Sequence, residues 1–162
     1  MEYVIRDCTE KDLPALVDLC GKHSEYEQAD YDPTGKEKLL KNAMFSNVPK
    51  LFCSVIEANS KLQGYFSYTL DYSTWDAQMF LYLDCLYLEP EFRGQRIGEI
   101  VFEKLRGIAA QNNCMNIQWQ TPVFNEGAIK FYNRIGGTGR EKVRFFIDTK
   151  PVDKKCQQAT ST

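Results

Sequence analysis

The chain has 162 residues, a length typical of one domain, and its 20 Lys and Arg against 22 Asp and Glu give a formal net charge of −2. This balance lacks the basic character of nucleic-acid-binding proteins, and no apolar run approaches the ~18 residues of a membrane span. We therefore expect neither nucleic acid nor a membrane as a partner. Six cysteines without a CxxC pair and an N-terminus without a signal-peptide core predict a cytoplasmic protein with reduced thiols and no metal site.

Hydrophobic periodicity predicts one α/β domain over residues 1–148. The expected strands cover residues 3–6, 51–58, 62–70, 79–88, 116–120 and 143–147. The expected helices start at a capping signal at Thr9, at Lys36, after residues 93–98 and at Asn125. The strands from 51 to 88 predict an antiparallel meander, and the strand–helix–strand unit that follows predicts a parallel, right-handed connection. The polar residues 71–77 predict a loop, and residues 149–162 predict a disordered tail.

The segment from Tyr82 to Gly98, YLDCLYLEPEFRGQRIG, is the most informative stretch. A dense run of apolar and aromatic residues predicts a buried strand, which Pro90 ends. Apolar residues at helical spacing then predict a helix that starts near Ile97. A turn of this kind presents free backbone N–H groups and the positive end of a helix dipole at one point, which favours binding of a phosphate.

This turn resembles the pyrophosphate loop of the GNAT superfamily of acetyl-CoA-dependent N-acetyltransferases, Arg/Gln-x-x-Gly-x-Gly/Ala. Arg93 and Gly98 match its first and last positions, whereas Arg96 stands where the middle glycine is usual. The side chain of Arg96 would either add a charged contact to phosphate or obstruct the loop, and we favour the contact because the other positions are intact. The resemblance implies the GNAT fold, a mixed and mostly antiparallel sheet flanked by helices and splayed at the cofactor. It implies acetyl-CoA contacts from Leu86, Tyr87, Leu88, Arg93, Gly94, Gln95, Arg96, Ile97, Gly98, Glu99, Asn125, Ala128, Phe131 and Tyr132.

A second stretch, Asn125-x-x-Ala128-x-x-Phe131-Tyr132-x-x-x-Gly136, is similar to the GNAT helix beside the cofactor thiol. The resemblance implies that Asn125 contacts the cofactor and that Tyr132 is a general acid. A thiol has a pKa of ~8.5 and a tyrosine ~10, so a tyrosine hydroxyl can donate to the leaving sulfur. The alternative is that both aromatic residues only pack in the core. We favour the functional role for Tyr132, because the rest of the motif is in register.

Two further stretches, residues 65–86 and Glu25-Tyr26-Glu27, resemble the spermidine/spermine N-acetyltransferase branch, which includes thialysine acetyltransferases. The resemblance implies a homodimer and a small amine substrate that contacts Tyr26, Glu27, Tyr72, Trp75 and Asp84. Asp84 replaces the branch's strand glutamate, a base for the amine, which with a pKa near 10.4 is protonated at neutral pH. Asp84 could equally be a carboxylate paired to a neighbour, and Tyr72 and Trp75 could equally anchor a loop.

The hypothesis is direct transfer of acetyl from acetyl-CoA to a primary amine, of a small polyamine or a lysine-like amino acid. The alternatives are a GNAT enzyme that acetylates protein N-termini or lysines, and a non-catalytic acyl-CoA-binding sensor. His23, the single histidine of the sequence, is expected on the surface at a helix end. Cys85 is expected to pack in the core, because a nucleophilic role would need an activating base.

Overall fold

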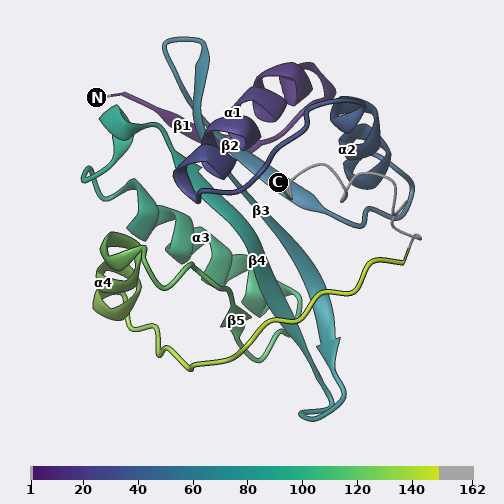
Figure 1. The fold of residues 1–162 in the computed structure, drawn as a ribbon, viewed down its shortest axis with the longest axis vertical. Coiled ribbons are helices and arrows are strands. Elements are labelled where there is room, and N and C mark those ends of the chain that lie inside the picture. Colours follow the sequence, from purple (N-terminus) through teal and green to yellow (C-terminus); the bar gives the residue numbers. More distant parts are fainter. Residues whose placement is uncertain (1, 150–162) are drawn as a thin grey trace, which may run out of the picture.

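A computed structural model describes residues 2–149, which form a five-stranded sheet between two layers of helices (Figure 1). In spatial order the strands are β1 (Val4–Asp7), β2 (Phe52–Ala58), β3 (Lys61–Ser73), β4 (Gln78–Leu88) and β5 (Ile117–Gln118). The helices are α1 (Leu13–Tyr26), α2 (Lys36–Met44), α3 (Ile97–Gln111) and α4 (Glu126–Arg134), with short 3₁₀ turns η1 (Glu10–Asp12) and η2 (Pro90–Phe92). The predicted antiparallel meander and the parallel pairing of β4 with β5 are both confirmed.

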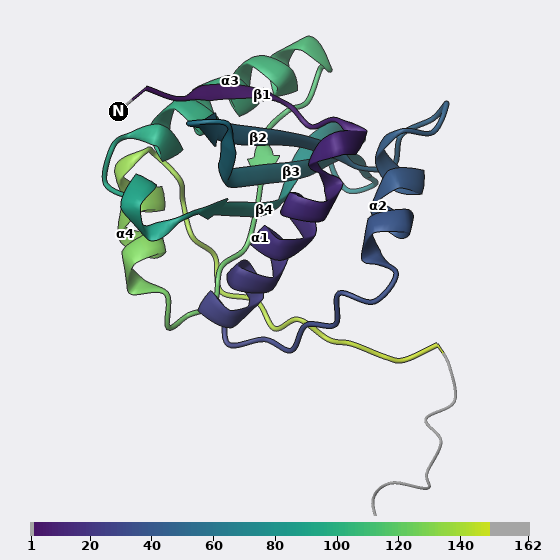
Figure 2. The same cartoon turned by 90° about the horizontal axis from the view of Figure 1, so that it is seen from above.

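The alternation of side chains along the strands divides the core into two parts. On one face, α1 buries Leu13 and Leu16 against β2 and β3, and Tyr65 and Tyr87 belong to the same cluster. On the other face, α3 packs its apolar stripe against Leu81 and its neighbours, and α4 lies beside it (Figure 2). The two helical layers therefore meet opposite faces of the same long strand, β4. No helix within residues 2–149 combines the length and the apolar content needed to cross a bilayer.

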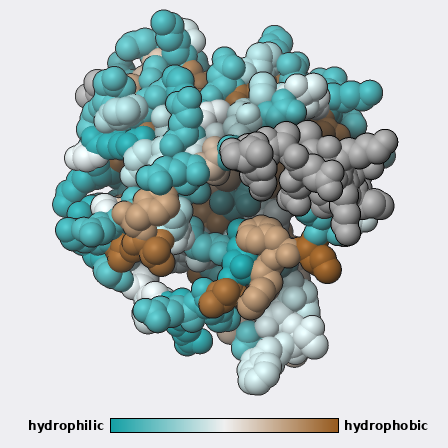
Figure 3. All heavy atoms as spheres, viewed as in Figure 1, coloured by the Kyte–Doolittle hydropathy of each residue, from teal (hydrophilic) through white to brown (hydrophobic). Residues whose placement is uncertain are grey.

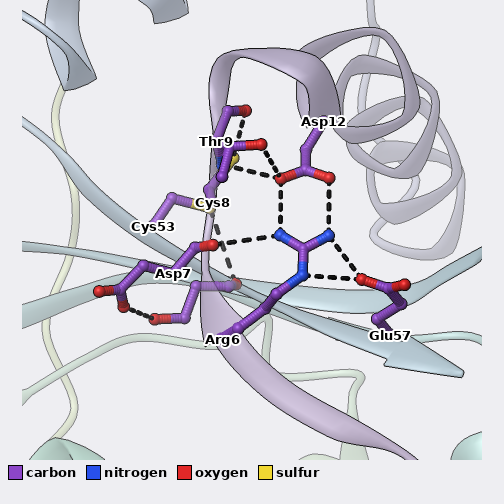
Figure 4. A network of polar contacts seen from close by, with 8 residues as sticks. Arg6, Asp7, Cys8, Thr9, Asp12, Cys53 and Glu57 are labelled. Carbon is purple, nitrogen blue, oxygen red and sulfur yellow. Dashed lines mark hydrogen bonds and ion pairs between the residues drawn. The ribbon is translucent and has the colours of Figure 1, made fainter. Parts of the chain in front are cut away.

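A network around Arg6 joins β1, β2 and the entry to α1 (Figure 4). The Arg6 guanidinium donates two parallel bonds to Asp12 at 2.8 and 2.9 Å and a third, through Nε, to Glu57 at 2.7 Å. Asp12 also accepts from the backbone and the hydroxyl of Thr9, which confirms the predicted capping signal at Thr9. These bonds hold the pKa of the Asp12 carboxyl well below its usual value, chiefly through Arg6. The network thereby fixes where the first helix leaves the sheet.

A β-bulge in β4 reverses which way its side chains point. The pairing with β3 runs from Leu83 opposite Tyr68 directly to Cys85 opposite Ser67, so Asp84 is the additional residue. Before the bulge Leu81 and Leu83 face the α3 core; after it Leu86 and Leu88 face that core, while Cys85 and Tyr87 face the α1 core. The bulge therefore places Tyr87 under α1 rather than under α3.

The sheet opens between β4 and β5. The two strands pair only at Leu81 with Ile117 and at Tyr82 with Gln118. Beyond this pair β4 continues for six residues that remain paired with β3 but have no strand on the β5 side in the described part of the chain. Leu81 donates its backbone N–H toward β5, to Asn116 at 3.1 Å. Because Leu86 and Leu88 have side chains on the same face as Leu81, alternation points their backbone groups toward this open edge as well. The edge ends at the turn that begins α3.

Two sequence predictions need correction. Strand β3 runs through Ser73, which shortens the predicted loop 71–77 to a turn. Residues 143–147 form no strand. The sheet ends at the two-residue strand β5, and within the described residues no strand pairs with the segment 143–147. Their large side chains remain exposed, and Figure 3 shows apolar side chains gathered along this segment. Beyond Thr149, the predicted disordered tail lies outside the described residues.

Candidate active site

The turn between η2 and α3 presents a row of free amides. The backbone N–H groups of residues 94–98 donate to no acceptor within the described chain, whereas those of Phe92 and Arg93 are bonded to preceding carbonyls. Gly94 has a φ of +73° and Arg96 a φ of +63°, and this left-handed backbone aims consecutive amides at one point. Together with the N-terminal end of α3, these donors fit a pyrophosphate.

The unusual residue of the loop, Arg96, adopts a conformation that normally requires glycine. Its backbone is left-handed, with φ +63° and ψ 8°, which explains why a glycine is usual at this position. Its side chain is 83% exposed and extends toward Glu99 at 3.7 Å, and Glu99 also accepts from Arg134 at 3.3 Å. The side chain of Arg96 thus points outward and leaves the amides of the loop accessible. Glu99, which we expect to contact the cofactor, lies between these two arginines.

Arg93 lies across the end of the open strand edge. Its Nε donates to the carbonyl of Leu88 at 2.9 Å, and its guanidinium lies over the ring of Tyr26 at 4.4 Å and that of Tyr87 at 5.4 Å. This arginine therefore covers one of the carbonyls expected to bind the cofactor. The side chain of Gln95 donates to the backbone carbonyl of Glu91 at 2.6 Å. This bond ties the loop to the preceding turn η2 and engages the side-chain amide of Gln95.

Helix α4 forms the wall of the candidate site opposite the open edge of β4. Asn125 caps it as predicted, because its side-chain oxygen accepts from the backbone N–H of Ala128 at 3.3 Å. The same oxygen accepts from the hydroxyl of Tyr26 at 3.1 Å, so the end of α1 contacts the start of α4 across the opening. A Cβ on Gly98 would lie 2.8 Å from Cζ of Phe131. The predicted cofactor residues Gly98 and Phe131 thus also form the contact that sets the distance between α3 and α4.

Tyr132 lies in an aromatic cluster that the sequence did not predict. Its ring packs edge-on against Trp119 at 5.3 Å and Phe102 at 5.9 Å. Burial, followed by the negative charge of Glu27 and the neighbouring Tyr26, raises the pKa of the Tyr132 hydroxyl to about 12. The hydroxyl is therefore protonated at neutral pH and can donate a hydrogen bond.

His23 is not on the surface, contrary to prediction: its side chain is only 13% exposed. The imidazole Nδ1 lies 3.0 Å from the hydroxyl of Tyr65, Nε2 lies 3.4 Å from a carboxylate oxygen of Glu27, and the ring packs on Tyr87 with centroids 5.4 Å apart. Burial lowers the pKa of His23, although the charges of Glu27 and Asp84 oppose this effect. His23 and Glu27, the residue that follows the last turn of α1, are four positions apart, and this helical spacing was the sequence signal that could have predicted their contact.

The other predicted substrate residues divide between two places. Asp84 lies exposed at the bulge, and its charge acts on His23, so it belongs with Glu27 and Tyr26. Tyr72 and Trp75 lie instead at the far end of the β3–β4 hairpin, which projects away from α1 and α4 (Figure 1). Trp75 is 96% exposed, and the Tyr72 hydroxyl donates to the carbonyl of Ala77 at 2.8 Å. A single copy of the chain therefore does not bring these two aromatic residues to the carboxylates.

The cysteines form no disulfide within the described residues. Cys8, Cys20, Cys53, Cys85 and Cys114 are all free there. Cys85 packs in the α1 core as expected, and burial raises the pKa of its thiol to about 12, so it carries little thiolate at neutral pH. Within residues 2–149, no group of three or more His, Cys, Asp or Glu side chains is arranged to hold a metal ion.

Comparisons with known proteins agree with this geometry. Residues 15–137 match the family model for the acetyltransferase (GNAT) family. A thialysine N-epsilon-acetyltransferase from Bos taurus is 28% identical over 141 residues, which is 82% of both chains, and the Mus musculus protein of that name is 26% identical over 140 residues. A solved structure of a possible acetyltransferase from Clostridium difficile 630 superposes with a TM-score of 0.76 at 18% identity, covering 93% of this chain and 100% of the other.

The family match spans most of the chain, and it includes both the loop of free amides and the helix that carries Tyr132. The open edge of β4 and the fold similarity agree with it. This chain belongs to the GNAT family of acetyl-CoA-dependent N-acetyltransferases.

Proposed function

We propose that this enzyme acetylates the primary amine of a small polyamine or a lysine-like amino acid. The observation that supports this substrate class is the pair of carboxylates, Glu27 and Asp84, whose charges both act on His23 beside the opening between β4 and β5. Two carboxylates at one place attract a cationic amine. The relatives named for thialysine acetylation support the same class.

Acetyl-CoA, the cosubstrate, would supply the acetyl thioester. The amides of residues 94–98 and the N-terminus of α3 would hold its pyrophosphate. The backbone of Leu86 and Leu88 would pair with its amide groups, as one strand edge pairs with another, and Arg93 would release the Leu88 carbonyl for that purpose. Asn125, Ala128 and Phe131 would line the opposite side on α4.

Tyr132 would act as the proton donor to the leaving sulfur. Its raised pKa, about 12, keeps the proton on the hydroxyl at neutral pH, and the charge of Glu27 at the end of α1 acts on this hydroxyl. The amine would attack directly, because Cys85, the cysteine of the central strand, has a raised pKa and is not an activated nucleophile. Replacement of Tyr132 by phenylalanine should reduce turnover and preserve acetyl-CoA affinity.

The exposed segment 143–147 supports the proposal of a homodimer. Val143, Phe145, Phe146 and Ile147 are each 77–92% exposed, an apolar run of the kind that marks an interaction surface. Light scattering coupled to size exclusion should give twice the mass of the chain, and Phe145→Ser with Phe146→Ser should shift it toward the monomer. The free thiols support a cytoplasmic location.

A thiol-release assay tests the function. Acetyl-CoA is offered with spermidine, spermine, putrescine, lysine, thialysine and a lysine-containing peptide in turn, and we expect turnover on one small amine. Preference for the peptide would instead assign protein acetylation. Acetyl-CoA binding by calorimetry without turnover on any amine would favour the sensor, and absence of binding would contradict the proposed function.

A further inference from the structure

His23 is a hydrogen-bonded histidine, only 13% exposed, to which the proposed function assigns no task. It packs against Tyr65 and Tyr87 of the α1 core, yet one side of its ring reaches the carboxylate of Glu27, and the other reaches the hydroxyl of Tyr65. Tyr65 is only 2% exposed, so its hydroxyl fixes the ring from within the core. The three side chains form a row that begins in the core and ends at the opening beside α4.

The direction of the hydrogen bonds in this row follows from the chemistry of its ends. A carboxylate oxygen can only accept, so the ring nitrogen that faces Glu27, Nε2, carries the proton of a neutral imidazole. Nδ1 is then the unprotonated nitrogen and accepts from the hydroxyl of Tyr65 at 3.0 Å. A neutral His23 therefore directs its Nε2 proton toward Glu27, 3.4 Å away, and leaves the negative charge on the carboxylate.

The surroundings keep the imidazole neutral. The groups facing it are Glu27 on α1, Tyr65 on β3, Tyr87 and Asp84 on β4, and Arg93 on the turn that follows. Burial and the positive charge of Arg93 lower the pKa of His23, and this outweighs the two carboxylates. A protonated histidine would form a full ion pair with Glu27 and make that carboxylate a weaker base.

Glu27 caps the end of α1 that contacts α4, the helix that carries the proposed proton donor. Tyr26, its neighbour in the chain, donates to Asn125 at the start of α4, which brings the end of α1 against the helix that carries Tyr132. A carboxylate oxygen of Glu27 lies 3.4 Å from the histidine, and the charge of Glu27 is one of the causes of the raised pKa of the Tyr132 hydroxyl.

We propose, on the basis of the proposed function, that Glu27 accepts the proton that the cationic amine must lose, and that His23, fixed by Tyr65, is the positioning residue that orients Glu27. This assigns the base to α1 rather than to Asp84 in the bulge of β4. Asp84 then contributes negative charge to the site and does not accept the proton.

The proton balance is complete. Glu27 takes one proton from the ammonium group, and the neutral nitrogen forms the C–N bond to the acetyl carbon. The C–S bond breaks, its electron pair stays on sulfur, and Tyr132 gives the sulfur a proton. The second proton lost by the nitrogen restores the Tyr132 hydroxyl, and Glu27 releases its proton to water, so that one proton leaves per acetyl group transferred.

Kinetics of matched variants test the role of Glu27. Glu27→Gln should lower kcat by about 10²-fold at pH 7.5, within the range of a general base, and the loss should shrink as the pH approaches the pKa of the free amine, near 10.4. Asp84→Asn removes the same charge nearby and should mainly raise the KM for the amine. Equal kcat for Glu27→Gln and wild type would overturn the inference and leave the proposed function intact, whereas an inactive wild type would overturn both.

The single histidine of the sequence allows a direct test of the positioning role. Nitrogen-15 NMR of the imidazole in the full-length protein should show the neutral form protonated at Nε2 at pH 7, and Tyr65→Phe should give a mixture of tautomers. His23→Gln, which can still donate and accept, should keep kcat within about threefold of wild type, while His23→Leu should lose about tenfold with an unchanged KM for acetyl-CoA. An imidazole protonated at Nδ1, or equal kcat for the two variants, would contradict the role.

Discussion

Gly98 offers a sharp test of how the two cofactor helices are held together. A Cβ at this position would lie 2.8 Å from Cζ of Phe131, about 0.6 Å short of an ordinary contact at 3.4 Å. The Phe131 ring is packed against Phe102 and Tyr132, so it has little room to yield. Overpacking of this kind costs about 1–3 kcal/mol. We expect Gly98→Ala to push α4, with Tyr132, away from α3.

Gly107 provides the matched control. It lies on the same helix, and a Cβ there would meet nothing within 4 Å. Gly107→Ala should therefore gain only helix propensity and stabilise the protein by about 0.5–1 kcal/mol. The difference in unfolding free energy between the two alanine variants isolates the clash and should be about 1–3 kcal/mol in favour of Gly107→Ala.

Urea titration followed by circular dichroism measures this difference, provided that the slope of the unfolding free energy with urea is unchanged. Phe131→Leu removes Cζ, so combining it with Gly98→Ala should recover part of the loss, with a coupling energy of at least about 0.5 kcal/mol. If Gly98→Ala were as stable as Gly107→Ala, or if its effect and that of Phe131→Leu were additive, then the close approach would not set the helix spacing. Gly98 would then be needed only for approach of the cofactor.

Three further predictions concern charge and backbone. Because burial lowers the pKa of His23, the folded state resists its protonation, so the melting temperature should fall as the pH drops below about 6.5. His23→Gln should reduce this loss of melting temperature with falling pH, and a variant with the same pH dependence as wild type would contradict the prediction. Arg6 lowers the pKa of Asp12, so the contribution of Asp12 to folding stability is present above the ordinary pKa of an aspartate and is lost as the pH falls below that value. Asp12→Asn should cost about 1–3 kcal/mol of unfolding free energy at pH 7, and in urea titrations from pH 7 to pH 2 this variant should lose less stability with falling pH than wild type. Arg96→Gly should be about 1 kcal/mol more stable than Arg96→Ala, because only glycine adopts φ +63° without strain; equal midpoints would refute the strain.

Much of the fold could be predicted because its signals are local. The period of the apolar residues located α1 to α4, and Asn125 was identified as a cap from its position before an apolar stripe. The prediction of a strand at residues 143–147 was wrong for a physical reason. The local sequence indicates that a segment can form a strand, but a neighbouring strand from another segment must supply the hydrogen-bond partners. Here β5 has only two residues, and the apolar segment remains outside the sheet.

The candidate site was only partly predictable, since its contacts join distant residues. The free amides of residues 94–98 follow from the pattern of strand, turn and helix in the sequence. The burial of His23 depends on Tyr65, 42 residues away, and no local pattern reports that contact. Trp119 and Phe102 likewise surround Tyr132 only after β5 and α3 have packed together.

The bulge at Asp84 connects these observations. In a regular strand, Tyr87 would share a face with Leu81 and Leu83, and it would point toward α3. The additional residue reverses the alternation, so Tyr87 packs beneath His23, while the backbone of Leu86 and Leu88 faces the opening. One inserted residue thus turns the ring of Tyr87 toward His23 and turns the backbone of Leu86 and Leu88 toward the edge proposed to hold the cofactor. Asp84→Asn preserves this backbone arrangement and removes only the charge that we propose Asp84 adds to the amine site, while Glu27 at the end of α1 is the proposed base.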